Sequence, residues 1–148
     1  MQPLSGCFEG KEHILPLRVY YEDTDAIGIV YYANYLKFAE RARTEMLRMV
    51  GIQQQAMSRD FGLAFAVRDC AVDYRRPARL DDVVEVRSRL LRLGTVAARA
   101  EQRLLCEGEE LASVRTKLAC IGADGRPSRI PQPLREALRP YCFSEEPE

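Results

Sequence analysis

The residues whose types and spacing could carry chemistry are concentrated between positions 20 and 35. Glu22, Asp23 and Asp25 lie within four residues, and an amphipathic helix is predicted directly after them. The first turn of a helix offers unpaired backbone N–H groups and a positive dipole end, which stabilise a carbonyl oxygen that gains negative charge. A carboxylate beside the same carbonyl carbon would act as nucleophile or as base for water. The segment suits acyl chemistry, although aspartates are also common in plain turns.

The single histidine, His13, limits the kinds of metal site and catalytic site that the chain can form. One histidine cannot form a histidine-rich metal site within one chain, and it would have to serve any Ser-His-Asp or Cys-His site alone. The Asp23-Thr-Asp25 pair does not continue as a calcium loop, because Ala26-Ile27-Gly28 follows it. We therefore expect chemistry based on carboxylates, hydroxyls and backbone amides, without a metal.

Composition predicts one ordinary globular domain spanning residues 1–148. The chain has 148 residues, of which 47% are hydrophobic, and 22 basic residues balance 22 acidic ones. The zero net charge and the lack of a nucleic-acid motif argue against a nucleic-acid partner. No apolar run reaches the roughly 18 residues of a membrane helix, and residues 1–11 do not resemble a secretory signal. The five cysteines form no C-x-x-C pair, so we expect reduced thiols and a cytoplasmic protein.

Hydrophobic periodicity and turn signals predict the elements that must position the candidate residues. Residues 33–50 carry apolar side chains at three- and four-residue steps, which indicates a long helix. Shorter helices are predicted at residues 53–60 and 131–138. The predicted strands are residues 13–22, 64–74, 83–93, 96–106 and 111–121. Residues 1–12 and 143–148 are predicted to be loose tails.

The order of these elements predicts an α+β fold. Short turns between the last four strands favour an antiparallel meander. One face of such a sheet needs cover, and the long helix is the one element large enough. We therefore expect an antiparallel sheet of about five strands wrapped around one long helix.

Three stretches carry a resemblance to a known family. They are Tyr21-Glu-Asp-Thr-Asp-Ala with Gly28-Ile-Val-Tyr-Tyr-Ala-Asn-Tyr35, Phe38-Ala-Glu-Arg-Ala-Arg-Thr-Glu-Met-Leu-Arg48, and Val72-Asp-Tyr-Arg-Arg-Pro-Ala-Arg-Leu-Asp-Asp82 with Leu93-Gly-Thr95. Over about residues 14–137 the chain resembles the hotdog-fold acyl-CoA thioesterases. It looks most like the branch that holds 4-hydroxybenzoyl-CoA thioesterase and the Tol–Pal-associated acyl-CoA thioesterase.

The resemblance implies roles for residues in the first stretch. Asp25 matches the catalytic carboxylate, and the backbone N–H of Tyr32 is expected to polarise the thioester carbonyl. Asn34 and Tyr35 are expected to shape the same pocket. The Tol–Pal branch usually has histidine at the position of Tyr32, so a backbone role is retained here and an imidazole role is not. Whether Asp25 attacks the carbonyl or activates water stays open. Glu40 is a second candidate carboxylate, with a surface pair to Arg43 as its plainer interpretation.

The resemblance also implies where the substrate lies. Coenzyme A carries phosphates that need basic partners, and Arg76, Arg92 and Thr95 are the expected contacts, although each arginine could also be an ordinary surface residue. Phe65 and Val67 are expected to contact the acyl group. Family members form dimers and often tetramers, so residues 65–68 of the partner subunit would face Asp25.

The sequence thus predicts an enzyme that hydrolyses short-to-medium-chain or aromatic acyl-CoA, with acyl carrier protein thioesters left open. Coenzyme A enters as part of the substrate, and no separate cofactor is expected. The Tol–Pal resemblance leaves open a peripheral link to envelope or phospholipid enzymes. The alternative is a non-catalytic hotdog module that binds acyl-CoA as a sensor or scaffold. A hydratase would need a histidine, and His13 lies outside the matching loop.

Overall fold

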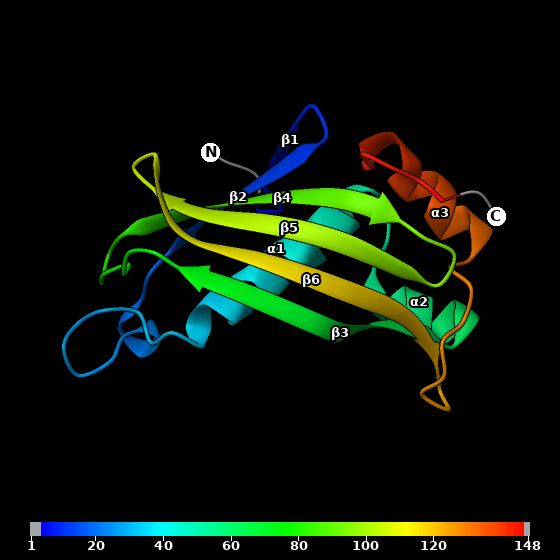
Figure 1. Cartoon of the computed structure of the whole chain (residues 1–148), viewed down its shortest axis with the longest axis horizontal. Coiled ribbons are helices and arrows are strands. Elements are labelled where there is room, and N and C mark those ends of the chain that lie inside the picture. Colours follow the sequence, from blue (N-terminus) through cyan, green and yellow to red (C-terminus); the bar gives the residue numbers. More distant parts are fainter. Residues whose placement is uncertain (1–3, 147–148) are drawn as a thin grey trace.

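A computed structural model describes residues 4–146 as an antiparallel sheet with helices packed against it (Figure 1). The strands of this part are β1 (Cys7–Glu9), β2 (Glu12–Arg18), β3 (Leu63–Tyr74), β4 (Val83–Leu93), β5 (Ala97–Cys106) and β6 (Glu109–Gly122). The helices are α1 (Asn34–Met49), α2 (Gln54–Phe61) and α3 (Gln132–Leu138), with short 3-10 turns at Tyr21–Asp23 and Arg139–Tyr141.

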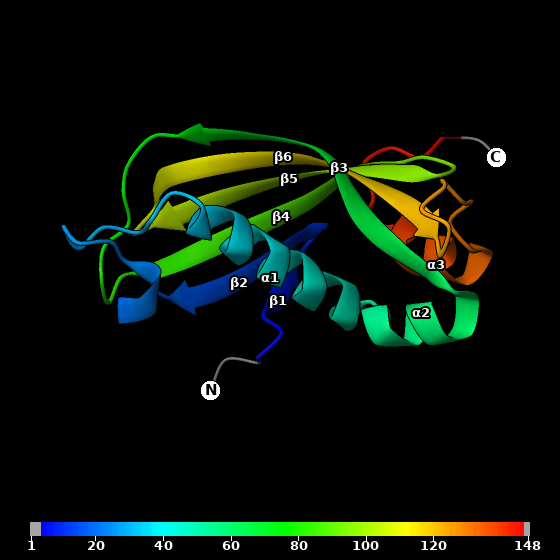
Figure 2. The same cartoon turned by 90° about the horizontal axis from the view of Figure 1, so that it is seen from below.

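Helix α1 lies along the concave face of the sheet, as Figure 2 shows from below. Its buried side chains recur at helical spacing, so one stripe of the helix faces the strands. Phe38, Ala39 and Ala42 pack in a core with inward-facing residues of the sheet, among them Val86 and Val114. The predicted architecture, an antiparallel sheet wrapped around a long helix, is confirmed.

The strand order is β1-β2-β4-β5-β6-β3, so the predicted meander holds only for β4, β5 and β6. Strand β3 pairs with β6 at one edge of the sheet and not with β4, which follows it in sequence. The connection over residues 75–82 therefore crosses to the far side of β5. It is held by buried Ala78, whose carbonyl accepts a 2.8 Å hydrogen bond from the amide of Val30. Local turn signals do not reveal such a crossover.

The first predicted strand is too long at its C-terminal end. Strand β2 ends at Arg18, because Val19 exchanges backbone hydrogen bonds with Asp81 and Asp82 instead of continuing the ladder. The chain then turns at Tyr21–Asp23, where a carboxylate oxygen of Asp23 accepts a 2.8 Å bond from the amide of Tyr20. This capping bond leads the chain out of the sheet and toward the start of α1.

Both predicted tails are wrong within the part of the chain that the structure describes. Residues 7–9 form β1, which pairs with β2 and adds a sixth strand to the expected five. At the other end, the amides of Phe143 and Glu146 donate to the carbonyls of Leu90 and Leu93, which docks the segment along the end of β4. Residues 1–3 and 147–148 lie outside the described residues.

Candidate active site

Asp25 lies in a closed loop between the 3-10 turn and α1. A backbone bridge joins Thr24 to Val30 at the base of the loop. Inside it, one carboxylate oxygen of Asp25 accepts hydrogen bonds from the amides of Ile27 at 3.0 Å and Ile29 at 3.3 Å. The Asp25 side chain is exposed in a single chain. The loop therefore fixes one carboxylate oxygen and leaves the other available to a substrate.

The next residues form a hydrogen-bonded turn at the start of α1. The amide of Tyr31 donates to the carbonyl of Asp23 at 3.0 Å, and the amide of Asn34 donates to the carbonyl of Tyr31 at 2.8 Å. Within residues 4–146, no protein group accepts a hydrogen bond from the N–H of Tyr32. This amide is a free donor at the positive end of a 16-residue helix, where a developing oxyanion would be stabilised.

Asn34 and Tyr35 face the protein in a single chain. The Asn34 side-chain amide donates a 2.8 Å hydrogen bond to the carbonyl of Asp23. The Tyr35 hydroxyl accepts one of 2.9 Å from the amide of Ala78, and burial raises the pKa of its phenol. The two side chains thus fix the Asp25 loop and the crossover connection against α1. Their predicted contact with substrate stays a prediction.

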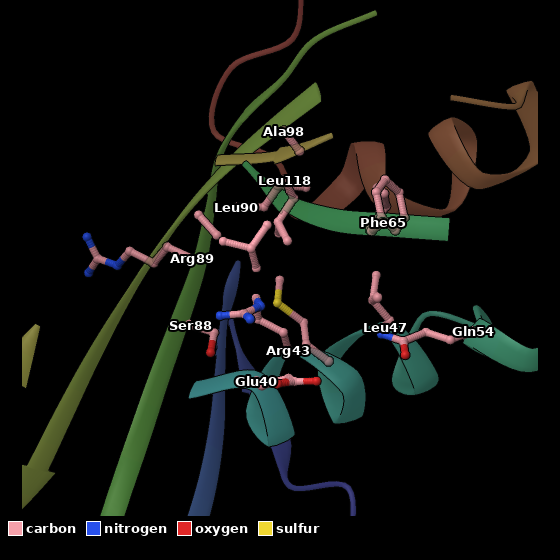
Figure 3. Close-up of a pocket in the computed structure, with 14 residues that line it drawn as sticks. Glu40, Arg43, Leu47, Gln54, Phe65, Ser88, Arg89, Leu90, Ala98 and Leu118 are labelled. Atoms are coloured by element: carbon pink, nitrogen blue, oxygen red, sulfur yellow. The ribbon is translucent and has the colours of Figure 1, made fainter. Parts of the chain in front are cut away.

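A cavity of about 260 Å³ lies between α1 and the concave face of the sheet (Figure 3). Most of its wall is apolar, with Phe65 and Val67 from β3 on one side and Met46 and Leu47 from α1 on the other. The remaining lining residues are Glu40, Arg43, Gln54, Ser88, Arg89, Leu90, Ala98, Ala100, Leu118 and Leu138. The predicted acyl contacts Phe65 and Val67 therefore do line a cavity.

Polar side chains also line this cavity, among them Arg43. The guanidinium of Arg43 donates a 2.9 Å hydrogen bond to Gln102, whose own amide donates to the carbonyl of Ala39 and to the hydroxyl of Ser88. Burial lowers the pKa of Arg43, opposed by the nearby charge of Glu40. The pattern of the sequence predicts a surface pair of Arg43 with Glu40, whereas the Arg43 side chain points inward to Gln102. The three-residue spacing on α1 gives no signal for it.

A single chain keeps the predicted site residues apart. Asp25 and Tyr32 precede the first residue of α1, whereas Phe65 packs with Met46 near the end of α1 and with Met57 of α2. Figure 2 shows the start of β3 beside α2. A 16-residue helix is about 24 Å long. Within one chain the carboxylate therefore lies before the start of α1, whereas the cavity runs along the helix from Glu40 to Leu47.

The residues predicted to contact coenzyme A also lie in two separate places. Arg92 and Thr95 line a surface groove with two further cations, Arg99 and Lys117. In the register of the sheet Arg92 lies opposite Arg99, and Arg99 lies opposite Lys117, so three cations from three strands form one row. Arg76 instead lies beyond the other end of the sheet, where it pairs with Glu109 at 2.8 Å. The sequence missed Arg99 and Lys117 because strand register is a long-range property.

The groove is already in contact with an acidic side chain. A carboxylate oxygen of Glu146 lies 2.6 Å from the guanidinium of Arg92. The backbone of Glu146 is tied to β4 through its bond to Leu93, and its carbonyl accepts a bond from Arg135. The C-terminal segment therefore places a negative charge where the sequence predicts a phosphate.

In residues 4–146 no three His, Cys, Asp or Glu side chains gather closely enough to hold a metal ion. Over the same span, no helix combines the length and the apolar character needed to cross a membrane.

The known proteins that this chain resembles include thioesterases. Residues 19–138 match the model of the thioesterase-like superfamily. The acyl-CoA thioesterase YbgC of Haemophilus influenzae is 41% identical over 124 residues, which cover 83% of this chain and 91% of that protein. The acyl-CoA thioester hydrolase YbgC of Escherichia coli is 43% identical over 107 residues, covering 72% and 79%. A solved probable thioesterase from Bartonella henselae superposes with a TM-score of 0.77 at 34% identity, covering 81% of this chain and 99% of that one.

Proposed function

Because this chain belongs to the thioesterase-like superfamily of hotdog proteins, we propose that it hydrolyses acyl-CoA thioesters to a free acid and coenzyme A. The observation that carries the proposal is the closed loop at the start of α1. It holds the Asp25 carboxylate through two amides and leaves the N–H of Tyr32 without a protein acceptor. A carboxylate and a free helix-terminal amide are the two groups that thioester cleavage needs.

In the proposed reaction the thioester oxygen accepts a hydrogen bond from Tyr32 N–H. By one route, Asp25 removes a proton from water while the water oxygen bonds to the carbonyl carbon. By the other, an Asp25 oxygen bonds to that carbon and gives a mixed anhydride, which water then cleaves. In both routes the carbon–sulfur bond breaks, and the thiolate of coenzyme A leaves with the electron pair and takes up a proton. No separate cofactor enters either route.

We propose that the complete site forms between two copies of the chain. The outer edge of β3 has no partner strand within the described chain, because β3 pairs only with β6. Antiparallel pairing of two β3 edges would place Phe65 near the start of one strand beside Tyr74 at the end of the other. That arrangement brings the cavity of one subunit toward the Asp25 loop of its partner. A homodimer is thus the smallest complete enzyme, and pairing of dimers would give the expected tetramer.

The cavity suits the acyl group of the substrate, and the groove suits its coenzyme A part. A cavity of 150 Å³ holds benzene in another protein, so about 260 Å³ suits a short-to-medium or aromatic acyl group. The cationic row of Arg92, Arg99 and Lys117 suits the phosphates of coenzyme A. An acyl carrier protein thioester would leave this row without a nucleotide.

We further propose a cytoplasmic location. All five cysteines are free thiols, as expected in a reducing compartment, and acyl-CoA esters are present there. A peripheral association with envelope or phospholipid enzymes is part of the same proposal. It would be tested by co-purification of the native protein from the membrane fraction at low and high salt.

The test of the function is release of free thiol from a panel of acyl-CoA esters. The panel runs from acetyl to palmitoyl and includes benzoyl and 4-hydroxybenzoyl. We expect steady turnover of several esters, and the ranking will identify the acyl group. Binding of acyl-CoA without thiol release would contradict the enzyme and favour the sensor or scaffold. Matched esters on acyl carrier protein distinguish the two carriers.

A further inference from the structure

Tyr74 connects the end of β3 to the turn that precedes α1. Its phenol donates a 3.0 Å hydrogen bond to the backbone carbonyl of Tyr32, across 42 residues of sequence. Burial, with smaller contributions from neighbouring tyrosines, raises the pKa of the Tyr74 phenol. The phenol therefore remains a protonated donor at neutral pH.

Ring contacts support the same connection. The Tyr74 ring meets the Tyr32 ring edge-on, with centroids 6.1 Å apart and planes at 82°. It also meets the ring of Tyr35 at 5.5 Å and 68°. Tyr35 is buried and bonded to the crossover connection through Ala78. Tyr74 thus braces the turn against a fixed part of the core.

Tyr74 restricts the rotation of the backbone at Tyr32. The peptide between Tyr31 and Tyr32 carries the free N–H, and its carbonyl is held by the amide of Asn34. The next peptide, between Tyr32 and Ala33, has its carbonyl held by Tyr74. Since both carbonyls that flank Tyr32 are bonded, rotation about the Tyr32 backbone is restrained on both sides. The direction of the Tyr32 N–H is fixed as a result.

We propose that Tyr74 is a positioning residue that holds the Tyr32 peptide so that its N–H points at the thioester oxygen. The inference rests on the proposed function, because it acts through the Tyr32 amide. Tyr74 touches no reacting atom in this scheme. Preorganised donors are effective because they need no reorientation as charge develops on the oxygen.

A stabilising role alone would predict a different outcome. Tyr74→Phe keeps the ring contacts with Tyr32 and Tyr35, and the carbonyl that loses its donor belongs to Tyr32, an exposed residue, so the effect on folding is minor. Misalignment of the Tyr32 amide, in contrast, weakens its hydrogen bond to the oxygen in the transition state and lowers kcat. We therefore expect Tyr74→Phe to keep the fold and KM while kcat falls by about three- to tenfold, the range of one neutral hydrogen bond.

The matched control is Tyr141→Phe. Tyr141 stacks on Phe8 near the C-terminal end, and among the described residues its hydroxyl has no hydrogen-bond partner. This variant should retain the kcat and KM of the parent protein. An equal fall in kcat for both variants, or an unchanged kcat for Tyr74→Phe, would overturn the proposal.

Raman spectroscopy measures the hydrogen bond between the Tyr32 amide and the thioester carbonyl directly. In the Asp25→Asn protein, which should bind acyl-CoA without turnover, Raman difference spectra report the stretch of the bound thioester carbonyl. We expect a lower frequency than in solution, and a return toward the solution value in Asp25→Asn/Tyr74→Phe. A lowered frequency that the second substitution leaves unchanged would contradict the role of Tyr74. A frequency equal to that in solution in both proteins would contradict the Tyr32 assignment itself.

Discussion

The side-chain amide of Asn34 donates a 2.8 Å hydrogen bond to the backbone carbonyl of Asp23. Asn34 is the first residue of α1, and Asp23 lies two residues before Asp25. The same carbonyl accepts a 3.0 Å bond from the amide of Tyr31. One carbonyl therefore joins the helix start, the turn with the free amide and the loop with the carboxylate. The geometry of the site depends on this junction.

Replacement of Asn34 by alanine tests that junction. The substitution removes one of two donors to the Asp23 carbonyl in a largely buried position. We expect unfolding free energy to fall by about 1–3 kcal/mol and kcat to fall by about tenfold, because the Asp25 loop loses its tie to α1. Urea unfolding and thiol release measure the two effects. Lys37→Ala, an exposed change on the same helix, is the control, and an Asn34→Ala protein with unchanged kcat would refute the positioning role.

Mixing of two inactive variants tests whether the site is shared between subunits. Asp25→Asn removes the carboxylate, and Val67→Arg puts a charge into the cavity wall. If each site takes Asp25 from one chain and the cavity from the other, a mixed dimer has one intact site. Random exchange at equal amounts should therefore restore about a quarter of parental activity.

The controls for this mixing are the two variants exchanged with themselves. Each should stay inactive, and sedimentation should show the same oligomer as the parent. A mixture with no activity, although mass spectrometry shows mixed dimers, would place Asp25 and the cavity in one chain and would refute the shared site.

The Glu146–Arg92 contact predicts a measurable effect on substrate affinity. If a coenzyme A phosphate binds Arg92 as proposed, the Glu146 carboxylate competes with it, whereas Glu146→Gln keeps the backbone bonds that dock the segment. We expect KM for acyl-CoA to fall by about two- to fivefold at low ionic strength, because an exposed ion pair contributes at most about 1 kcal/mol. The difference should shrink as salt is added.

Two comparisons control this prediction. Glu145→Gln removes the neighbouring carboxylate, which pairs with Arg139 rather than with Arg92, and should leave KM unchanged. A pantetheine thioester, which lacks the nucleotide, should show no effect of Glu146→Gln. An equal change in KM for both substrates would contradict a phosphate contact at Arg92.

The buried imidazole of His13 should make the free energy of unfolding depend on pH. It is fully buried, its Nε2 lies 2.7 Å from the carbonyl of Ser5, and burial lowers its pKa against the opposing influence of Ser5 and Glu45. Below the unfolded pKa of about 6.5 the unfolded chain binds a proton that the folded protein does not. Stability should therefore fall as pH drops below 6.5, by at most about 1.4 kcal/mol per pH unit from this group.

Urea unfolding at pH 7.5, 6.5, 5.8 and 5.2 measures this effect in the parent and in His13→Gln. We expect the loss of stability between pH 6.5 and 5.2 to be smaller in His13→Gln, since the titrating group is absent. Parallel curves for the two proteins would show that the pKa of His13 is not lowered by folding.

The sequence predicts best the part of the candidate site that is continuous in the chain, where local patterns and the family resemblance coincide. Asp25, Tyr32 and Asn34 lie within ten residues, and the amphipathic pattern marks the helix that follows them. The closed loop and the free amide of Tyr32 follow from this short segment. Most of its hydrogen bonds run between residues close in sequence, and those to Tyr74 and Ala78 are the exceptions.

The remaining contacts depend on strand order and register, which have no short-range signal. The bond from Tyr74 to Tyr32 spans 42 residues and exists because β3 ends beside the start of α1. The row that joins Arg92 to Arg99 and Lys117 needs the exact pairing of three strands. Docking of Glu146 likewise depends on a cation that a distant strand supplies.

We propose that cleavage of the thioester depends on the Asp25 carboxylate. The most direct measurement is kcat for thiol release from the best ester of the panel, in the parent, in Asp25→Asn and in Glu22→Gln, a nearby exposed carboxylate as control. We predict a loss of at least about a hundredfold for Asp25→Asn, the size expected for a general base or nucleophile, and full activity for Glu22→Gln. A folded Asp25→Asn protein that turns over at the parental rate would contradict the account.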